Sequence, residues 1–191
     1  DYEIFVAEVA STVNETLLTK HLLENADSDE LRVHALDQYL ERFRSTLFRQ
    51  TMFAAFEQAI HEHDEAGKPL TPDVFDELYG DLKAEFYGHV DATVDEHIRR
   101  EWMRIPHFYY NFYVYQYSTG ISAAAAIVDR IEGEGEVAAE EYRAALRAGG
   151  AEYPIDVLET AGIDMTESDP IESAIGVYDD YLDEAEALLD L

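Results

Sequence analysis

An α-helical pattern opens the chain in the stretch Ile4-Phe5-Val6-Ala7-Glu8-Val9-Ala10-Ser11-Thr12-Val13. Its apolar residues, continued by leucines further along, recur with the 3.6-residue period of an α-helix, which predicts a helix over residues 2–25. The same period returns along the rest of the chain. It predicts further helices over residues 28–63, 71–88, 92–104, 108–131, 136–147 and 170–189.

Local signals mark where several of these helices begin and end. Ser28 and the pair Thr71 and Pro72 are typical of helix starts, and Gly149 is typical of a helix end. No stretch alternates apolar and polar residues as a half-buried strand does, and no repeat or linker divides the chain. The sequence therefore predicts an all-α fold, a single multi-helix domain over residues 1–191.

The chain is strongly acidic. Its 191 residues include 42 Asp and Glu against 13 Lys and Arg, a net charge of −29, and no Cys. Because nucleic acids and anionic membrane surfaces bind through Lys and Arg, the composition argues against both as partners. No stretch of 18 apolar residues predicts a membrane span. Acidic residues spread over a whole chain are typical of proteins in concentrated salt, so we expect a halophilic, cytoplasmic protein.

The common catalytic motifs are absent from the sequence. It contains no glycine-rich phosphate loop, no GxSxG serine motif, no calcium loop and no HExxH zinc motif. The nearest string, His61-Glu62-His63, has its histidines two positions apart, so they point to different sides of a helix and cannot form a helical zinc pair. We expect this string to be the solvated end of a long helix.

One acidic residue, Glu8, has apolar neighbours on nearly every side of the first predicted helix. We expect its carboxylate to be at least partly buried, and a buried charge costs several kcal/mol unless it is hydrogen-bonded, paired or bound to a metal. Spacing alone favours a hydrogen bond or an arginine partner over a metal. Ser11 and Glu15 fall on nearly the same face, so the three residues form a polar stripe that faces something polar.

A second unusual feature is the run Ile105-Pro106-His107-Phe108-Tyr109-Tyr110-Asn111-Phe112-Tyr113-Val114-Tyr115-Gln116-Tyr117. Seven aromatic residues fall between positions 108 and 117, more than one core-facing stripe of a helix requires. Several tyrosines and a histidine on one helix could donate hydrogen bonds to a substrate carbonyl or to an anionic transition state. The alternative, which composition alone favours, is a helix buried all round with its hydroxyls bonded locally.

Together, these two segments resemble oligoendopeptidase F, a family of zinc metallopeptidases similar to thimet oligopeptidase. The resemblance rests on residues 1–15 and 102–120, which follow each other in this order, and it extends loosely to the C-terminus. It covers the whole chain but only the C-terminal third or so of a family member. The resemblance thus implies that residues 1–191 are the C-terminal helical part of a metallopeptidase catalytic domain.

The resemblance also implies a Zn2+ site. Glu8 occupies the position of the glutamate that completes the metal site in that family, beside two histidines of an HExxH helix upstream. Ser11 and Glu15 would then orient the ligands. The family further places histidine and tyrosine side chains where they hold the scissile carbonyl and stabilise its tetrahedral oxyanion, and the candidates here are His107, Tyr110, Tyr113 and Tyr115.

The missing HExxH motif removes two zinc ligands and the general base. One glutamate cannot hold zinc with useful affinity, since a catalytic site uses about three protein ligands and a water. We therefore expect the intact protein to be a zinc metalloendopeptidase that hydrolyses short peptides. We expect this segment to be inactive without the missing N-terminal part of the same chain. An uncovered apolar face could also drive association into a homo-oligomer. The competing hypothesis is a non-catalytic, all-helical peptide-binding or scaffolding protein.

Overall fold

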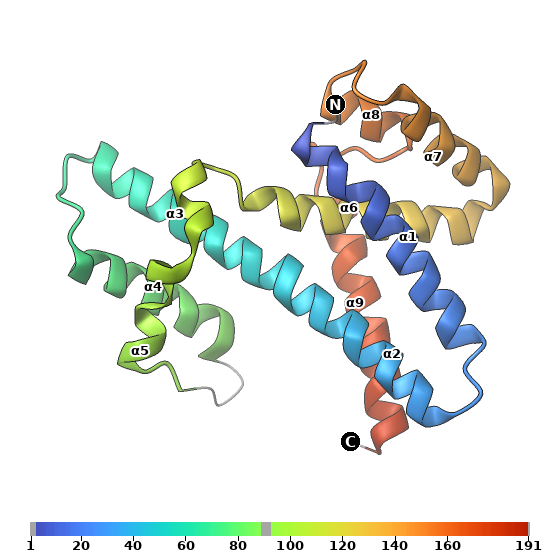
Figure 1. Ribbon diagram of the computed structural model, residues 1–191, viewed down its shortest axis with the longest axis horizontal. Coiled ribbons are helices and arrows are strands. Elements are labelled where there is room, and N and C mark those ends of the chain that lie inside the picture. The colour runs from blue at the N-terminus through green and yellow to red at the C-terminus, as the bar shows by residue number, and fades with distance from the viewer. Residues whose placement is uncertain (1–2, 89–92, 191) are drawn as a thin grey trace. The chain divides into compact units, whose positions relative to one another are not determined.

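The computed structural model describes residues 3–88 and 93–190 (Figure 1). These residues form helices joined by turns, with no β-strand among them, which confirms the all-α prediction. Within the fold, contacts group the chain into two compact units. Unit 1 comprises the described residues of 1–47 and 116–191, and unit 2 comprises those of 48–115. None of the helices in the described ranges combines the length and the apolar character that a membrane span needs.

Each unit has its own set of helices. Those lying wholly or almost wholly in unit 1 are α1 (Ile4–Glu24), α2 (Asp29–Arg42), α6 (Tyr115–Glu134), α7 (Glu136–Ala148), α8 (Pro154–Thr160) and α9 (Asp169–Leu189). Those of unit 2 are α3 (Arg49–Glu65), α4 (Pro72–Tyr87), α5 (Glu96–Arg99) and the 3₁₀ turns η3 (Glu101–Arg104) and η4 (Pro106–Tyr110). A π-helical turn, η1 (Phe43–Phe48), contains the boundary between the units.

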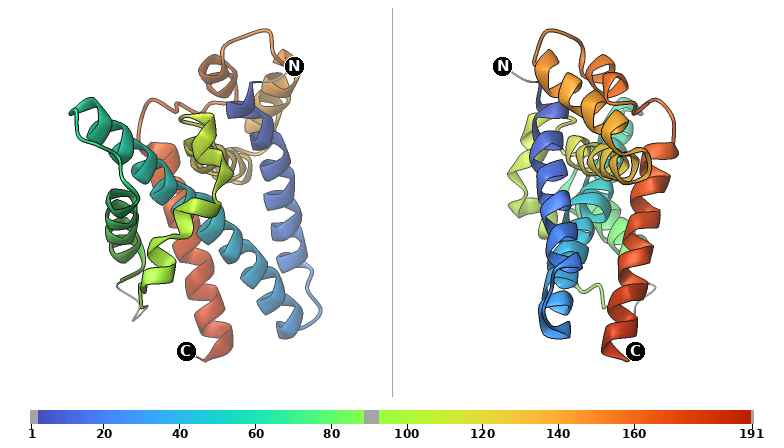
Figure 2. Two further views of the ribbon diagram at one scale, coloured as in Figure 1. Left: turned by 60° about the vertical axis from the view of Figure 1, so that its left-hand side comes forward. Right: turned by 90° about the vertical axis from the view of Figure 1, so that its right-hand side faces the viewer.

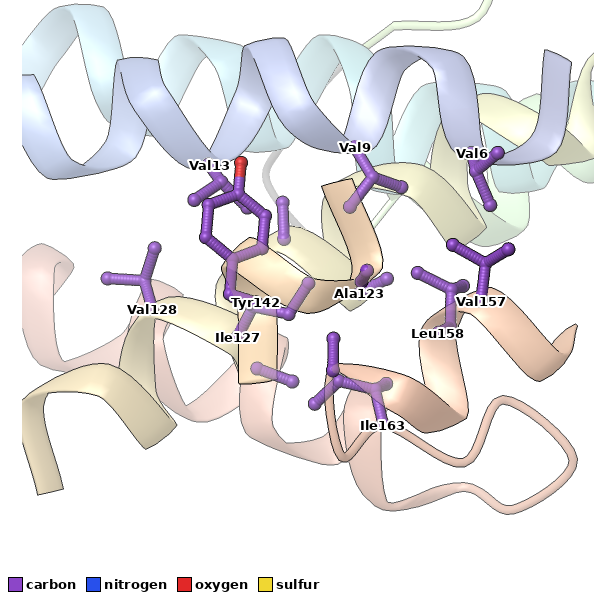
Figure 3. Packing of buried hydrophobic residues seen from close by; sticks show 14 residues of the cluster. Val6, Val9, Val13, Ala123, Ile127, Val128, Tyr142, Val157, Leu158 and Ile163 are labelled. Atoms are coloured by element: carbon purple, nitrogen blue, oxygen red, sulfur yellow. The ribbon is translucent and has the colours of Figure 1, made fainter. Parts of the chain in front are cut away.

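The main core of unit 1 forms where α1 meets α6, α7 and α8 (Figure 3). α1 contributes Val6, Val9 and Val13, whose spacing of three and four residues places them on one side of the helix. α6 contributes small and branched side chains, and α8 contributes Val157 and Leu158. Full burial of a valine or leucine side chain stabilises a fold by about 1.5–3 kcal/mol, so this contact fixes which face of α1 points inward.

A second layer of unit 1 pairs α9 with α2, and the two helices lie side by side in Figures 1 and 2. The rings of Tyr39 in α2 and Tyr181 in α9 meet edge to face, with centroids 5.0 Å apart. Arg32 and Glu184 form an ion pair between the same helices. The C-terminal helix is thereby packed against the N-terminal helices of the chain.

Three of the predicted helix ends are confirmed in atomic detail. The Ser28 hydroxyl accepts a hydrogen bond from the Leu31 N–H at 3.3 Å, and the Thr71 hydroxyl accepts one from the Val74 N–H at 3.4 Å. These side chains cap α2 and α4. Gly149 follows α7 with a φ of +61°, a conformation that glycine adopts without steric cost.

The predicted helix over residues 108–131 is wrong in its first part. Residues up to Tyr110 form the 3₁₀ turn η4, and α6 begins only after a further turn. In that turn, Asn111 and Phe112 have positive φ values of 37° and 54°, which no right-handed helix contains. The Phe112 N–H donates to the Glu57 carboxylate at 2.7 Å, so a hydrogen bond to another helix replaces the expected helical one.

Two short helices also differ from the prediction. Of the helix predicted over 92–104, residue 92 lies outside the described residues, and the described part divides into α5 and η3. Asp95 caps α5: its Oδ1 atom accepts hydrogen bonds from the backbone N–H groups of His97 and Ile98, at 2.8 and 2.9 Å. The helix α8 was not predicted, although Pro154 at its first position and Asp156 in its first turn are recognised start signals.

The core of unit 2 is aromatic and lies between α3, α4 and η4. The Phe56 ring makes edge contacts with Tyr79 of α4, at a centroid distance of 5.2 Å, and with Phe108 of η4, at 5.1 Å. Phe53 also meets the Phe108 ring edge to face, at 5.6 Å. These contacts seat η4, the turn that carries His107, on the side of α3.

Candidate active site

Glu8, Ser11 and Glu15 lie on one face of α1, and all three are exposed. The expectation that the Glu8 carboxylate is partly buried is therefore wrong. The buried valines of α1 occupy the opposite side of the helix, because successive residues turn by about 100°. Ile4 and Ala7, two of the apolar neighbours that suggested burial, are themselves exposed.

The three side chains nevertheless have defined contacts. The Ser11 hydroxyl lies 2.9 Å from the Glu8 carbonyl oxygen and 3.2 Å from the Glu8 Oε2 atom, so it can donate to either. Glu15 forms an ion pair with Arg42 of α2. Ser11 thus lies within hydrogen-bonding reach of the carboxylate that it was predicted to orient, whereas Glu15 is paired with a cation.

A groove of about 430 Å³ in unit 1 contains Glu8 and Glu15. Its walls come from α1, α2, η1 and α6, and its lining residues are Glu8, Thr12, Glu15, Gln38, Glu41, Arg42, Ser45, Thr46, Tyr117 and Ile121. Three carboxylates and one guanidinium line the same space. The groove is therefore acidic and polar, and it suits a cation or hydrogen-bonding groups better than an apolar ligand.

Tyr117 was not among the predicted site residues, although it lines the groove together with Glu8. It precedes Ile121 by one helical turn, and both side chains face this space. Ile121 also opens the buried apolar run of α6. This spacing places Tyr117 on the same side of α6 as Ile121, but the groove itself depends on α1 and α2, which the sequence around Tyr117 does not reveal.

Three of the predicted catalytic residues form one cluster in unit 2. The His107 ring stacks on the Tyr113 ring, with centroids 5.5 Å apart and planes inclined by 11°. Tyr110 completes the cluster, with ring centroids 6.4 Å from His107 and 6.0 Å from Tyr113. Tyr115 lies beyond the turn, at the first residue of α6, with 41% of its surface exposed. The cluster therefore brings together one imidazole and two phenols.

Glu101 anchors the segment that leads to this cluster. Its side chain is 11% exposed and accepts hydrogen bonds from the Tyr79 hydroxyl at 2.7 Å and from the Lys83 ammonium at 3.1 Å. Arg49 and Arg104 also form ion pairs with it. Burial alone would raise the pKa of Glu101. The hydrogen bonds from Tyr79 and Lys83, with the positive charges of Lys83 and Arg49, outweigh burial and lower that pKa to about 2.

The described residues do not form a metal site by themselves. Within residues 3–88 and 93–190, no three His, Cys, Asp or Glu side chains converge in a way that could hold a metal ion. Glu8 can supply one carboxylate oxygen, and a zinc ion needs about three protein ligands. A complete zinc site therefore does not fit these residues alone.

Comparison with known proteins finds relatives that are named as oligopeptidases. It is 51% identical over 189 residues to the oligopeptidase PepF of Bacillus subtilis (strain 168), covering 99% of this chain and 28% of that protein. It is 44% identical over 190 residues to the chromosomal oligoendopeptidase F of Lactococcus lactis subsp. cremoris, covering 100% of this chain and 31% of that protein. The chain thus spans less than a third of the length of either relative.

A solved structure agrees with these relatives. The crystal structure of oligoendopeptidase-F from Enterococcus faecium matches with a TM-score of 0.93 and 46% identity, covering 99% of this chain and 36% of that one. The sequence signature of peptidase family M3 matches residues 1–177. Since that match extends over most of the sequence, the chain belongs to peptidase family M3.

Proposed function

We propose that residues 1–191 are the C-terminal helical part of the catalytic domain of a zinc metalloendopeptidase that hydrolyses short peptides. The observation that carries this proposal is the exposed Glu8 carboxylate, which lines an acidic groove within hydrogen-bonding reach of the Ser11 hydroxyl. Membership of a peptidase family supports the reaction class. The other zinc ligands and the general base would come from an HExxH helix outside this chain.

In this proposal Glu8 supplies one oxygen ligand of Zn2+. When bound, the metal would polarise the scissile carbonyl and lower the pKa of a water molecule. The Ser11 hydroxyl would restrict the rotation of the Glu8 carboxylate, so that its oxygen is held in place before the metal arrives. The ion pair with Arg42 would compensate the charge of Glu15, which leaves Glu15 an orienting rather than a ligating role.

The aromatic cluster would act on the substrate carbonyl. His107, Tyr110 and Tyr113 carry N–H and O–H donors. Such donors stabilise the oxyanion of a tetrahedral intermediate more strongly than the neutral carbonyl. We propose Tyr115 as a further donor. The substrate would be a short peptide.

The test uses the full reading frame that contains this chain. The expressed protein should hydrolyse short peptides, and loss of activity with a chelator should be reversed by zinc. His107→Ala and Tyr113→Phe should each lower kcat by about 100-fold, the size of effect found for removal of one oxyanion donor. Tyr109→Phe is the matched control, because Tyr109 is 87% exposed. If the two variants lost stability and turnover in equal measure, the aromatic residues would have only a structural role.

The competing hypothesis is a non-catalytic peptide-binding or scaffolding protein that shares this architecture. It predicts a full reading frame without HExxH, and peptide binding without cleavage. Finding that motif upstream of residue 1 would favour the enzyme. A full-length protein that binds peptides, lacks the motif and releases no cleavage product would overturn the proposal.

A further inference from the structure

A buried carboxylate that the proposed mechanism does not use lies in unit 2. Glu57 is in the middle of α3 and has 1% of its surface exposed. Its Oε1 atom accepts a hydrogen bond from the Phe112 N–H at 2.7 Å, across 55 positions of sequence. A carboxylate placed out of water costs several kcal/mol unless hydrogen bonds compensate it. Glu57 is therefore bound to a particular backbone group rather than to solvent.

The backbone group that it binds lies in a strained turn. Asn111 and Phe112 both have positive φ, a conformation that costs a non-glycine residue of order 1–2 kcal/mol. Residues held in such conformations persist only where their surroundings enforce them, and they cluster at functional sites. A hydrogen bond whose buried partner would otherwise be left unpaired is worth about 1–3 kcal/mol, comparable to the strain of the turn, so the bond from Phe112 N–H to Glu57 can enforce it.

A second side chain of α3 contacts the same turn. His61 lies one helical turn after Glu57, and its ring packs against the Phe112 ring with a centroid distance of 4.5 Å. The sequence had suggested that His61 belongs to a solvated helix end. Instead, one face of α3 contacts both the backbone of Phe112, through Glu57, and its side chain, through His61.

The turn determines whether the aromatic cluster can form. His107 and Tyr110 precede it, and Tyr113 follows it. In a continuous α-helix, residues 107 and 113 would point about 120° apart and lie about 9 Å apart along the axis, too far to stack. With the turn in place, the two rings stack at 5.5 Å.

We infer that Glu57 is a positioning residue for the peptidase reaction: its carboxylate holds the turn at Asn111 and Phe112, and the turn brings Tyr113 against His107. This inference rests on the proposed function, because it assumes that the cluster contacts the substrate. The feature of Glu57 that holds the turn is the position of its acceptor oxygen. The negative charge itself is secondary.

Two variants separate the position of the acceptor from its charge. Glu57→Gln keeps an acceptor oxygen in the same place without the charge, whereas Glu57→Asp keeps the charge but withdraws the oxygen by about 1.5 Å, one carbon–carbon bond. Glu65→Gln, at the exposed end of the same helix, is the control. Trp102 fluorescence reports whether unit 2 is folded, since Trp102 is the chain's only tryptophan.

The readouts are kcat and KM of the full-length protein and hydrogen exchange of the Phe112 amide. We expect Glu57→Asp to lower kcat by about 10- to 100-fold with KM within about threefold, the effect of a reacting group misplaced by an ångström. The Phe112 amide should exchange at least about tenfold faster in the same variant. Glu57→Gln should retain most of kcat and of the protection.

Three results would overturn the inference. One is a folded Glu57→Asp protein with unchanged kcat, and another is a Glu57→Gln protein that loses as much kcat as Glu57→Asp. The third is equal protection of the Phe112 amide in all variants. A wild-type protein that cleaves no peptide would instead overturn the proposed function, and the exchange measurement would still show whether Glu57 holds the turn.

Discussion

Replacing Glu101 by glutamine should destabilise unit 2 without changing its shape. The carboxylate ties η3 to α3 through Arg49 and to α4 through Lys83 and Tyr79. Glutamine is nearly isosteric and can still accept a hydrogen bond from Tyr79, but it leaves Arg49, Lys83 and Arg104 without the anion that all three pair with. Removing one member of a partly buried ion-pair network is the costly kind of change.

The pKa of Glu101 gives the size of the effect. Its value of about 2, against an ordinary 4.5, corresponds by linkage to about 3 kcal/mol of folding free energy. Solvent screening around the partly exposed cations reduces the expected loss to about 2 kcal/mol. We expect this difference in the free energy of unfolding between wild type and Glu101→Gln at neutral pH.

The pH dependence follows from the sign of the shift. A carboxylate whose pKa is lowered on folding stabilises the protein above its unfolded pKa, and that stabilisation disappears as the pH falls toward its folded pKa. The difference between the two proteins should therefore be constant from pH 7 to about 5 and should shrink between about pH 4.5 and 2.

Urea unfolding followed by Trp102 fluorescence, at constant salt, measures this difference within unit 2 itself. A loss below about 0.5 kcal/mol at pH 7 would place Glu101 among ordinary surface ion pairs. A difference that persists undiminished at pH 2 would show that the destabilisation has a cause other than the lost charge. Either result would refute the reasoning.

Three further perturbations test the packing and the charge. Phe56→Ala, at a fully buried position, should cost about 3–5 kcal/mol in the same urea assay, and a cost below about 1 kcal/mol would contradict the unit 2 core. Gly162→Ala should lower stability by about 1–2 kcal/mol, because the φ of Gly162 is +77° and the new methyl group would collide with the Arg130 guanidinium. The control, Gly176→Ala, adds a methyl group in open space within α9 and should be neutral or stabilise the protein by up to about 1 kcal/mol. Calorimetry should show Tm rising between about 0.1 and 2 M NaCl as the net charge of −29 is screened, and a constant Tm would argue against salt adaptation.

Local signals correctly predicted several helix ends. Ser28, Thr71 and Gly149 act within their own helices, and the structure places helix ends at each of them. The broken helix at Phe112 could not be predicted in the same way, because the hydrogen bond that enforces it comes from Glu57, 55 positions away. A run of aromatic residues with helical spacing gives no sign of such a tertiary bond.

The candidate site was predictable in its residue types but not in its environment. Glu8 was singled out because of its apolar neighbours, yet Ile4 and Ala7 are exposed together with it. Exposure depends on which elements cover a helix face, and sequence periodicity identifies only the face that packs inward. Tyr117 was missed for a similar reason, since its place in the groove depends on α1 and α2 as well as on its own helix.

The most direct test of the account is the zinc content of the full-length protein with Glu8→Gln. Glu24→Gln is the control, because Glu24 is an exposed carboxylate on the same helix. The wild type and the control should bind zinc stoichiometrically, and Glu8→Gln should bind it at least about tenfold more weakly, since the amide oxygen is a poorer ligand than a carboxylate. Stoichiometric zinc held by Glu8→Gln with wild-type affinity would contradict the role of Glu8 as a metal ligand.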